Sequence, residues 1–164
     1  MFRNTSLRTP IGPITITCKD EKVWHLSLGN LLPNHDAVSS ENLIFGKVKD
    51  QLDEYFTSIR KEFNIPLDWE QLHGFQRKVL EIVSRVPYGS VVSYGQIAAK
   101  SGSPKASRAV GAALAHNPLP ILIPCHRVIS SNGHLTGYLG QKGIETKRWL
   151  LELEGLKVVG EKLG

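Results

Sequence analysis

The sequence has few cysteines and no long apolar run, and each absence excludes a class of protein. Two cysteines in 164 residues, Cys18 and Cys125, are too few for a disulfide scaffold or a four-ligand zinc finger. No apolar run approaches the ~20 residues that a transmembrane helix needs, and the amino terminus lacks the apolar stretch of a signal peptide. We therefore expect a cytoplasmic protein with free thiols and no membrane association.

Acidic residues are absent from a long part of the sequence, from Ile82 to Ile144. Residues 1–72 contain 8 Lys and Arg against 10 Asp and Glu, whereas residues 73–164 contain 12 against 5. The net charge of +5 is therefore concentrated in the second half. A basic surface without acids favours a polyanionic partner, and nucleic acid is the leading candidate.

Apolar periodicity in the first part of the chain predicts a small α+β domain. We expect a helix at residues 43–59 and strands at residues 14–18, 23–27 and 63–67. The first two strands form a hairpin or meander, in which Cys18 is a buried structural thiol. The change of character at residues 68–74 indicates a boundary, so we expect domains at 1–72 and 73–164.

The second half is predicted to be mainly helical. We expect a short strand at residues 90–92 and helices at residues 75–83, 94–100 and 103–116. Ser103 and Pro104 suit the N-cap and the first turn of the third helix. Because Gly102 joins two consecutive helices by a tight turn, the pattern indicates a helix-turn-helix, although unrelated helical hairpins share it.

The third of these helices has almost no large side chains. Arg108 is the only long polar residue between positions 106 and 115. Such a helix packs closely against another helix, but it also suits a narrow groove of DNA. The minor groove is only ~6 Å wide, so a bulky helix would have to force it open. The single guanidinium favours the second interpretation.

Cys125 lies in the most informative segment of the chain. It follows Pro124 at the end of an apolar, strand-like run and precedes His126 and Arg127. Nearby cations lower the pKa of a thiol from its free value of ~8.5, and a histidine can accept the proton, so the segment predicts a nucleophile. A bend at Pro124 would bring Cys125 and His126 together.

The remaining histidines do not indicate a metal site. None forms a compact ligand spacing with either cysteine: His25, His35, His73, His116 and His134. We therefore expect no required metal.

Ordered motifs in the second half resemble those of a known family. The segment Ile123-Pro124-Cys125-His126-Arg127-Val128 resembles the active-site signature of the O6-alkylguanine-DNA alkyltransferases, also called methylated-DNA–protein-cysteine methyltransferases. Further motifs match in order and spacing: Ser93-Tyr94-Gly95-Gln96-Ile97-Ala98, Ser107-Arg108-Ala109-Val110-Gly111, Asn117-Pro118, and Trp149-Leu150-Leu151 through Glu154-Gly155. The resemblance covers residues 73–157, whereas residues 1–72 match only in size and strand-first pattern.

The resemblance implies a fold and a reaction. The fold is α+β, with a small ribonuclease H-like domain of sheet and helix followed by a mostly helical, winged-helix-like DNA-binding domain with a helix-turn-helix. The reaction is direct repair: an O6-alkylguanine is flipped from the duplex, and its alkyl group passes irreversibly to Cys125, once per molecule. The implied partner is double-stranded DNA, bound through the minor groove by a monomer that needs no cofactor.

The resemblance also assigns catalytic roles. Cys125 is the alkyl acceptor, and His126 is the base that acts on it through water. Glu154 orients the histidine, while Glu152 is a near alternative by position. Asn117 holds the turn that precedes the active-site strand.

Other residues are implied to contact the DNA. Tyr94 crowds the 3′ phosphate and then donates to guanine N3. Arg108 enters the base stack as a wedge. Ser103 and Ser131 fall at positions that touch the DNA backbone.

Substrate contacts are implied around the flipped base. The carbonyls of Cys125 and Val128 accept from the guanine amino group, and Tyr138 forms a wall of the pocket. Leu139 departs from the Ser or Ala of many relatives, so it narrows or reshapes the pocket while its backbone N–H remains able to donate to O6. The range of accepted alkyl groups is therefore open.

Two other functions compete with this interpretation. A noncatalytic damage-sensing DNA-binding protein would share the fold, but such relatives lack the cysteine. A cysteine hydrolase using Cys125, His126 and Glu154 would not explain Arg108 or the acid-free basic stretch. Turnover separates the alternatives, since a hydrolase releases product repeatedly and an alkyltransferase stops after one equivalent.

Overall fold

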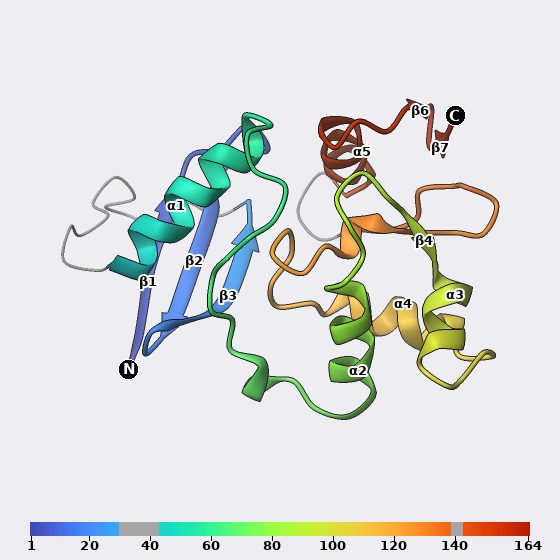
Figure 1. Ribbon diagram of the computed structural model, residues 1–164, viewed down its shortest axis with the longest axis horizontal. Helices are drawn as coiled ribbons and strands as arrows, with labels where there is room; N and C mark the ends of the chain where they lie inside the picture. The colour runs from blue at the N-terminus through green and yellow to red at the C-terminus, as the bar shows by residue number, and fades with distance from the viewer. Residues whose placement is uncertain (30–42, 139–142) are drawn as a thin grey trace. The chain divides into compact units, whose positions relative to one another are not determined.

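The computed structural model describes residues 1–29, 43–138 and 143–164. They form two compact units, Met1–Gln71 and Leu72–Gly164 (Figure 1). The division falls one residue before the boundary that we expected after residue 72. Within the described residues, no helix is long and apolar enough to cross a membrane.

The first unit is a three-stranded antiparallel sheet with one helix across a face (Figure 1). Its elements are β1 (Phe2–Leu7), β2 (Ile14–Lys19), β3 (Lys22–Leu28) and α1 (Leu43–Phe56). Ile14 and Ile16 of the central strand and Val48 and Leu52 of the helix are fully buried, because alternate strand residues and helix residues four apart each form one apolar face. The expected meander is confirmed, the expected helix is formed but ends at Phe56 rather than at residue 59, and Cys18 is buried as expected.

The strand expected at residues 63–67 is not formed. Leu67 makes a single parallel bridge with Val23, in which the Val23 N–H donates to Pro66 O (2.9 Å) and the Asp68 N–H to Val23 O (2.9 Å). Pro66 has no N–H to donate, so the ladder does not extend toward the amino terminus. The chain turns instead into a short 3₁₀ helix, η1 (Trp69–Gln71).

The second unit is built around three helices that pack against one another, α2 (Gly74–Val83), α3 (Tyr94–Lys100) and α4 (Ser107–Ala115). Its other elements are β4 (Val92–Ser93), η2 (Cys125–Arg127), β5 (Val128–Ile129), α5 (Ile144–Leu153), β6 (Val158–Val159) and β7 (Lys162–Leu163). Strands β4 and β5 pair in parallel, with Val92 opposite Val128. This pairing places the start of α3 beside the segment that follows Cys125.

Helices α3 and α4 form the expected pair joined by a glycine turn, but Ser103 is not the N-cap of the second helix. Gly102 adopts a positive φ of 87° after α3, and the Ala106 N–H donates to Ser103 O (2.9 Å), which closes a turn. Pro104 occupies the second position of this turn, where its fixed φ is favourable. Helix α4 therefore begins only at Ser107, after an Ala106 N-cap without a side-chain hydrogen bond.

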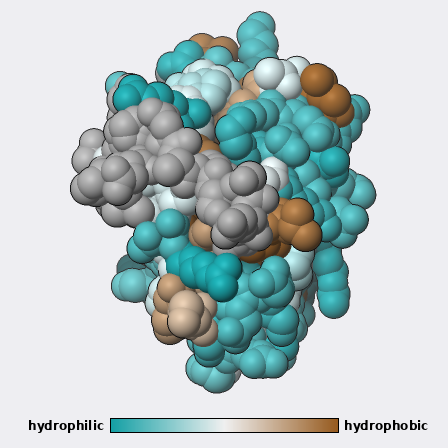
Figure 2. Space-filling model, turned by 90° about the vertical axis from the view of Figure 1, so that its left-hand side faces the viewer, coloured by the Kyte–Doolittle hydropathy of each residue, from teal (hydrophilic) through white to brown (hydrophobic). Residues whose placement is uncertain are grey.

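Large apolar side chains are exposed at separate positions of the described chain: Met1, Phe2, Leu43, Ile59 and Val159. Figure 2 shows one face of the molecule, on which hydrophilic residues predominate and apolar residues form small separate areas. Most of the large apolar side chains are thus buried inside the two units.

A capping box holds the start of α3, and its removal gives a direct test of the fold. Gln96 N–H donates to Ser93 Oγ (3.1 Å), and Ser93 N–H donates to Gln96 Oε1 (2.8 Å). We expect Ser93→Ala to lower the free energy of unfolding by about 1 kcal/mol, measured by urea denaturation. Ser93→Asp keeps an acceptor at the cap and should stay close to wild type; equal stability of all three proteins would contradict the cap's role.

Candidate active site

Asn117 shapes the segment that leads to Cys125. Its Oδ1 accepts from the Leu119 N–H (2.9 Å), and its Nδ2 donates to Ile123 O (3.1 Å). The apolar run is therefore a turn rather than the strand that we expected, and the Ile123 N–H donates to Leu119 O (2.8 Å). Ile121 lies inside the turn with a φ of 73°, an unfavourable conformation for a β-branched residue that the surrounding hydrogen bonds must maintain.

Cys125, His126 and Arg127 form the 3₁₀ helix η2, which directly follows Pro124. A 3₁₀ helix has three residues per turn, so three consecutive side chains point in three different directions. Cys125 lines a cavity, whereas His126 and Arg127 both reach Glu154. The segment expected to continue as a strand is thus a helical turn. Because of this turn, Cys125 lines the cavity while His126 and Arg127 contact the acid.

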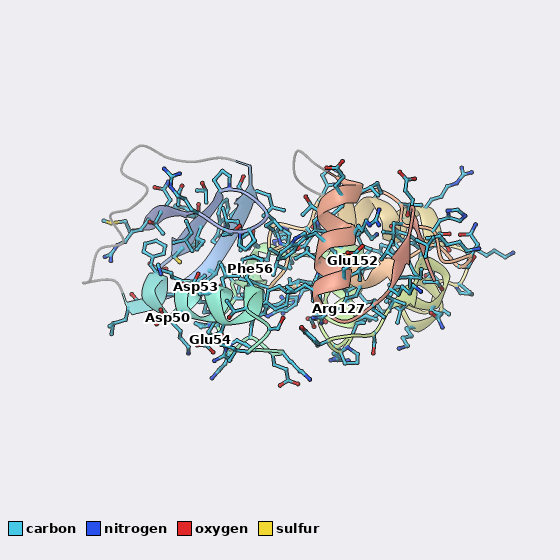
Figure 3. The ribbon with its side chains drawn as sticks, turned by 90° about the horizontal axis from the view of Figure 1, so that it is seen from above. Asp50, Asp53, Glu54, Phe56, Arg127 and Glu152 are labelled. Carbon is cyan, nitrogen blue, oxygen red and sulfur yellow. The ribbon has the colours of Figure 1, made fainter. Side chains whose placement is uncertain are left out.

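The carboxylate of Glu154 is held between two side chains of η2. His126 Nε2 lies 2.6 Å from Glu154 Oε2, and Arg127 donates from Nε to Oε1 (2.7 Å) and from Nη2 to Oε2 (3.0 Å). Arg127 Nη1 also donates to Val86 O (2.7 Å). All three side chains are buried, and Figure 3 shows Arg127 beside helix α5.

Glu154, rather than Glu152, is the acid that meets His126. Glu152 lies on α5 (Figure 3), is exposed, and forms an ion pair with Arg148 at 2.7 Å. Glu154 follows the end of α5, where the helix has stopped and the side chain turns inward. The alternative left open by sequence position is settled by this difference in direction.

The charge states of the cluster follow from its contacts. Burial by itself raises the pKa of Glu154, but the hydrogen bonds and charges of His126 and Arg127 outweigh burial and lower this pKa to about 2. Burial lowers the pKa of His126 despite the opposing effect of Glu154. At neutral pH the cluster therefore contains a carboxylate, a guanidinium and a neutral imidazole.

The neutral imidazole has one nitrogen available as a base. Because the Glu154 carboxylate only accepts, Nε2 of His126 carries the proton that it donates. Nδ1 then keeps its lone pair; it is buried and has no hydrogen-bond partner among residues 1–29, 43–138 and 143–164. A buried acceptor without a partner is unusual, and here it is the nitrogen that can take up a proton.

Cys125 lies in the wall of a cavity of about 230 Å³. The volume is small for a ligand site and suits a single flat heterocycle. The described lining residues come from α3, α4, η2, α5 and the segment before residue 139: Tyr94, Gly111, Leu114, Ala115, Cys125, Gly137, Tyr138 and Lys147. The thiol is thus presented to a small cavity.

The thiol itself is protonated at neutral pH. Burial raises the pKa of Cys125 to about 11, and the hydrogen bond from Asn117 and the charge of Lys147 offset only part of this effect. We expected adjacent cations to lower this pKa, and that expectation is wrong. Arg127 is paired with Glu154 and His126 is neutral, so neither adjacent residue supplies free positive charge, and a base must remove the proton.

A wider, open groove adjoins the cavity. It is lined by Tyr94, Ser107, Arg108, Gly111, Thr136 and Gly137, so it shares three residues with the cavity. A Cβ built at Gly111 meets no atom within 4 Å, which leaves the surface of α4 bare at this point. The groove therefore connects the exposed Arg108 side chain with the entrance to the cavity.

Comparison with known proteins identifies the chain. The family model of the 6-O-methylguanine DNA methyltransferase DNA binding domain matches residues 74–156, and that of the ribonuclease-like domain of the same proteins matches residues 2–69. The chain belongs to the 6-O-methylguanine DNA methyltransferase family. The two models match both units, so membership rests on the whole chain and not on the cysteine motif alone.

Individual members of the family resemble the chain over nearly their full length. The constitutive methylated-DNA–protein-cysteine methyltransferase of Bacillus subtilis is 42% identical over 158 residues, which cover 92% of this chain and 93% of the relative. The crystal structure of Mycobacterium tuberculosis O6-methylguanine methyltransferase aligns with a TM-score of 0.79 at 40% identity, covering 94% and 93%. The structure of Mycobacterium tuberculosis OGT in complex with DNA aligns with a TM-score of 0.76 at 39% identity, covering 92% and 91%.

The structure of this family member brings together most of the residues expected at the site. Tyr94, Cys125 and Tyr138 line the cavity. Val128 follows η2, and its carbonyl accepts from Lys147 Nζ at 2.6 Å.

Two expected DNA-contact residues, Ser103 and Ser131, are not among the described lining residues of the cavity. Ser103 and Ser131 are exposed in turns, and Leu139 lies outside the described residues.

The roles of Arg127 and Lys147 do not follow from the sequence pattern. Arg127 was recognised only as a cation beside the cysteine, whereas its guanidinium holds Glu154. Lys147 lies one turn after Ile144 and one turn before Leu150 and Leu151, on the buried face of α5. A lysine within an apolar stripe of helical period was the available signal.

The pairing of Glu154 predicts how stability depends on acid. The pKa of Glu154 is about 2 in the folded protein and 4.5 for the free side chain. The stability that its ionised carboxylate contributes is therefore fully present above about pH 4.5 and is lost as the pH falls toward 2. We expect Glu154→Gln to lower the free energy of unfolding by about 3–5 kcal/mol at pH 7, because Arg127 remains buried without its carboxylate partner. The variant should also lose less stability than wild type as the pH falls from 4.5 toward 2. Urea unfolding between pH 2 and 7 measures both effects.

The exposed Glu152 provides the control for this prediction. Glu152→Gln removes a surface ion pair, which contributes about 0–1 kcal/mol, and should leave the acid dependence of wild type unchanged. If Glu154→Gln and wild type lost stability in parallel below pH 4.5, the buried carboxylate would not be the group that titrates.

Proposed function

We propose that this protein repairs DNA by transferring the alkyl group of O6-alkylguanine to Cys125, once per molecule. The observation that carries the proposal is the position of the Cys125 thiol in a cavity the size of a nucleobase, with a neutral histidine and a paired carboxylate behind it. The chain acts in this proposal as a monomer, without metal or cofactor, and its second unit provides both DNA binding and the acceptor thiol.

The transfer is a displacement at the alkyl carbon. The Cys125 sulfur forms a bond to this carbon, the bond from the carbon to O6 breaks, and the electron pair passes to O6 and into the guanine ring. Tyr94 donates a proton to N3 of the departing base. The product is a thioether and has no leaving group that water readily displaces, so the thiol is not regenerated and the protein stops after one equivalent.

Proton removal from Cys125 is the role of His126. With a thiol pKa of about 11, almost no thiolate forms at neutral pH without a base. The proton passes through a water molecule to Nδ1 of His126, the nitrogen without a partner among the described residues. The imidazolium that results is stabilised by the Glu154 carboxylate at 2.6 Å from Nε2, while Arg127 keeps that carboxylate ionised.

Binding to duplex DNA precedes the reaction. The target carbon inside a base stack is not accessible in line to a thiolate, so the nucleotide must be extruded, at a cost of a few kcal/mol. We place the bare face of α4 in the minor groove, with Arg108 entering the stack and Tyr94 pressing on the 3′ phosphate. Their shared open groove beside the cavity supports this assignment, as does the acid-free sequence from Ile82 to Ile144.

The remaining contacts recognise the flipped base and the DNA strand. The carbonyls of Cys125 and Val128 accept from the guanine amino group; a carbonyl has two lone pairs, so Val128 can do so while it accepts from Lys147. Tyr138 packs against the ring. Ser103 and Ser131 contact the DNA backbone, which their exposure permits.

Intact-protein mass spectrometry tests the reaction directly. After incubation with a duplex that carries one O6-methylguanine, we expect the protein mass to rise by one methylene group, saturating at one equivalent, and Cys125→Ala to show no increase. No increase with tight binding retained would contradict alkyl transfer and indicate a damage-sensing binding protein. Release of repeated product would indicate a hydrolase.

The wedge role of Arg108 predicts a difference between substrates. We expect Arg108→Ala to slow repair of the duplex by at least about tenfold, because part of the cost of extrusion is no longer offset, and to affect a single-stranded oligonucleotide much less. Lys105→Ala is the control, since Lys105 is another exposed cation of the acid-free stretch and loss of its charge should weaken binding of both substrates alike. An equal loss on both substrates in Arg108→Ala would refute the wedge.

A further inference from the structure

Lys147 is a buried cation that the proposed mechanism does not use. Its side chain lies on α5 and is 1% exposed. The ammonium donates to three carbonyl oxygens, those of Val128 (2.6 Å), Thr136 (3.0 Å) and Gly137 (3.5 Å). None of the described carboxylates forms an ion pair with it. Three neutral acceptors satisfy its hydrogen bonds but leave its charge uncompensated.

The three carbonyls belong to two segments that build the cavity. Val128 follows η2 and therefore the acceptor thiol, whereas Thr136 and Gly137 precede Tyr138. Tyr94 is joined to the same place, since its hydroxyl donates to Thr136 O (3.2 Å) and accepts from Thr136 Oγ1 (2.9 Å).

Lys147 Nζ also lies 5.8 Å from the centre of the Tyr94 ring. The ammonium thus connects the two segments that form the walls of the cavity.

No counter-charge among the described lining residues of the cavity neutralises the ammonium of Lys147. Of the cavity-lining residues that the structure describes, Lys147 alone is charged at neutral pH. The titratable groups that face it are the thiol of Cys125, the imidazole of His126 and the phenols of Tyr94 and Tyr138. The thiol is neutral until it loses its proton. His126 and Tyr94 are neutral at pH 7, because burial lowers the pKa of His126 and raises that of Tyr94.

Burial without a carboxylate partner makes this cation costly. It lowers the pKa of Lys147 to about 8, although a Cys125 thiolate would raise it. A leucine or methionine would fill the same apolar face of α5 without this cost. A costly charge that lies beside a nucleophile is better explained by the reaction than by the fold.

We infer that Lys147 is a positioning residue of the alkyl-transfer reaction, which clamps the two walls of the cavity and stabilises the Cys125 thiolate by its charge. This inference rests on the proposed function for the meaning of the thiolate. Its electrostatic part is independent of DNA, because the charge acts on the thiol before any base enters.

The reaction of Cys125 with iodoacetamide at different pH values tests the electrostatic part without DNA. Peptide mass spectrometry separates Cys125 from Cys18. At pH 7 we expect Lys147→Met to react about tenfold more slowly than wild type or slower still, because the thiolate loses the charge that lowers the pKa of Cys125. The ratio of the two rates should fall as pH rises above about 8, because Lys147 in wild type then loses its proton.

Two further variants separate charge from shape. Lys147→Arg keeps a cation at every pH, so its advantage over Lys147→Met should persist above pH 8. Lys157→Met removes an exposed lysine and should match wild type. Rates of Lys147→Met equal to wild type, or a loss that is independent of pH and equally large in Lys147→Arg, would overturn the electrostatic role.

Thermal unfolding checks that each variant is folded. If Lys147→Met does not fold, Lys147→Gln, whose amide can still donate to the Val128 carbonyl, takes its place in the same comparison.

Methyl transfer from the O6-methylguanine duplex supplies the second measurement. Lys147→Met should be slower than Lys147→Arg by at least the ratio found with iodoacetamide, since the cavity walls are also released. If wild type accepts no methyl group while the iodoacetamide rates show the expected pH pattern, the proposed function fails and the thiolate role of Lys147 stands. If wild type is methylated and the rates show no such pattern, only the inference about Lys147 fails.

Discussion

A single buried carboxylate organises the site. Glu154 must remain ionised inside the protein, and it does so because Arg127 donates two hydrogen bonds to it at 2.7 and 3.0 Å and His126 lies at 2.6 Å. These hydrogen bonds hold η2 against the end of α5, and Arg127 also donates to Val86 O. Burial keeps the histidine neutral, and the charge of Arg127 adds to this effect, so one nitrogen remains available as a base.

Burial also sets the resting state of the thiol. Burial raises the pKa of Cys125 to about 11, so the sulfur is protected until a base and a substrate are both in place. A protein that can react only once benefits from this, since a permanently ionised thiol would be consumed by other electrophiles. Lys147 acts in the opposite direction, as a charge that is available to the thiolate when it forms.

Local sequence pattern predicted the elements whose burial follows from spacing alone. The meander and the helix that was expected at 43–59 and ends at Phe56 have one apolar face each, and the helix expected at 94–100 is α3. The pattern failed where backbone hydrogen bonds override composition. Pro66 ended a strand at a single bridge, the turn at Ser103 delayed α4 to Ser107, and the side chain of Asn117 folded an apolar run into a turn.

The sequence by itself determined the family, and it singled out the cysteine and histidine that we propose take part in the transfer, because these depend on residues that are adjacent or regularly spaced. Only the tertiary structure decided that Glu154 rather than Glu152 meets His126, that Arg127 holds the acid, and that Lys147 faces the cavity. Those contacts join η2 and Val128 to residues about 20–30 positions later in the chain. The charge state of each group also depends on burial, which residue order does not specify and which arises only when α5 packs against η2.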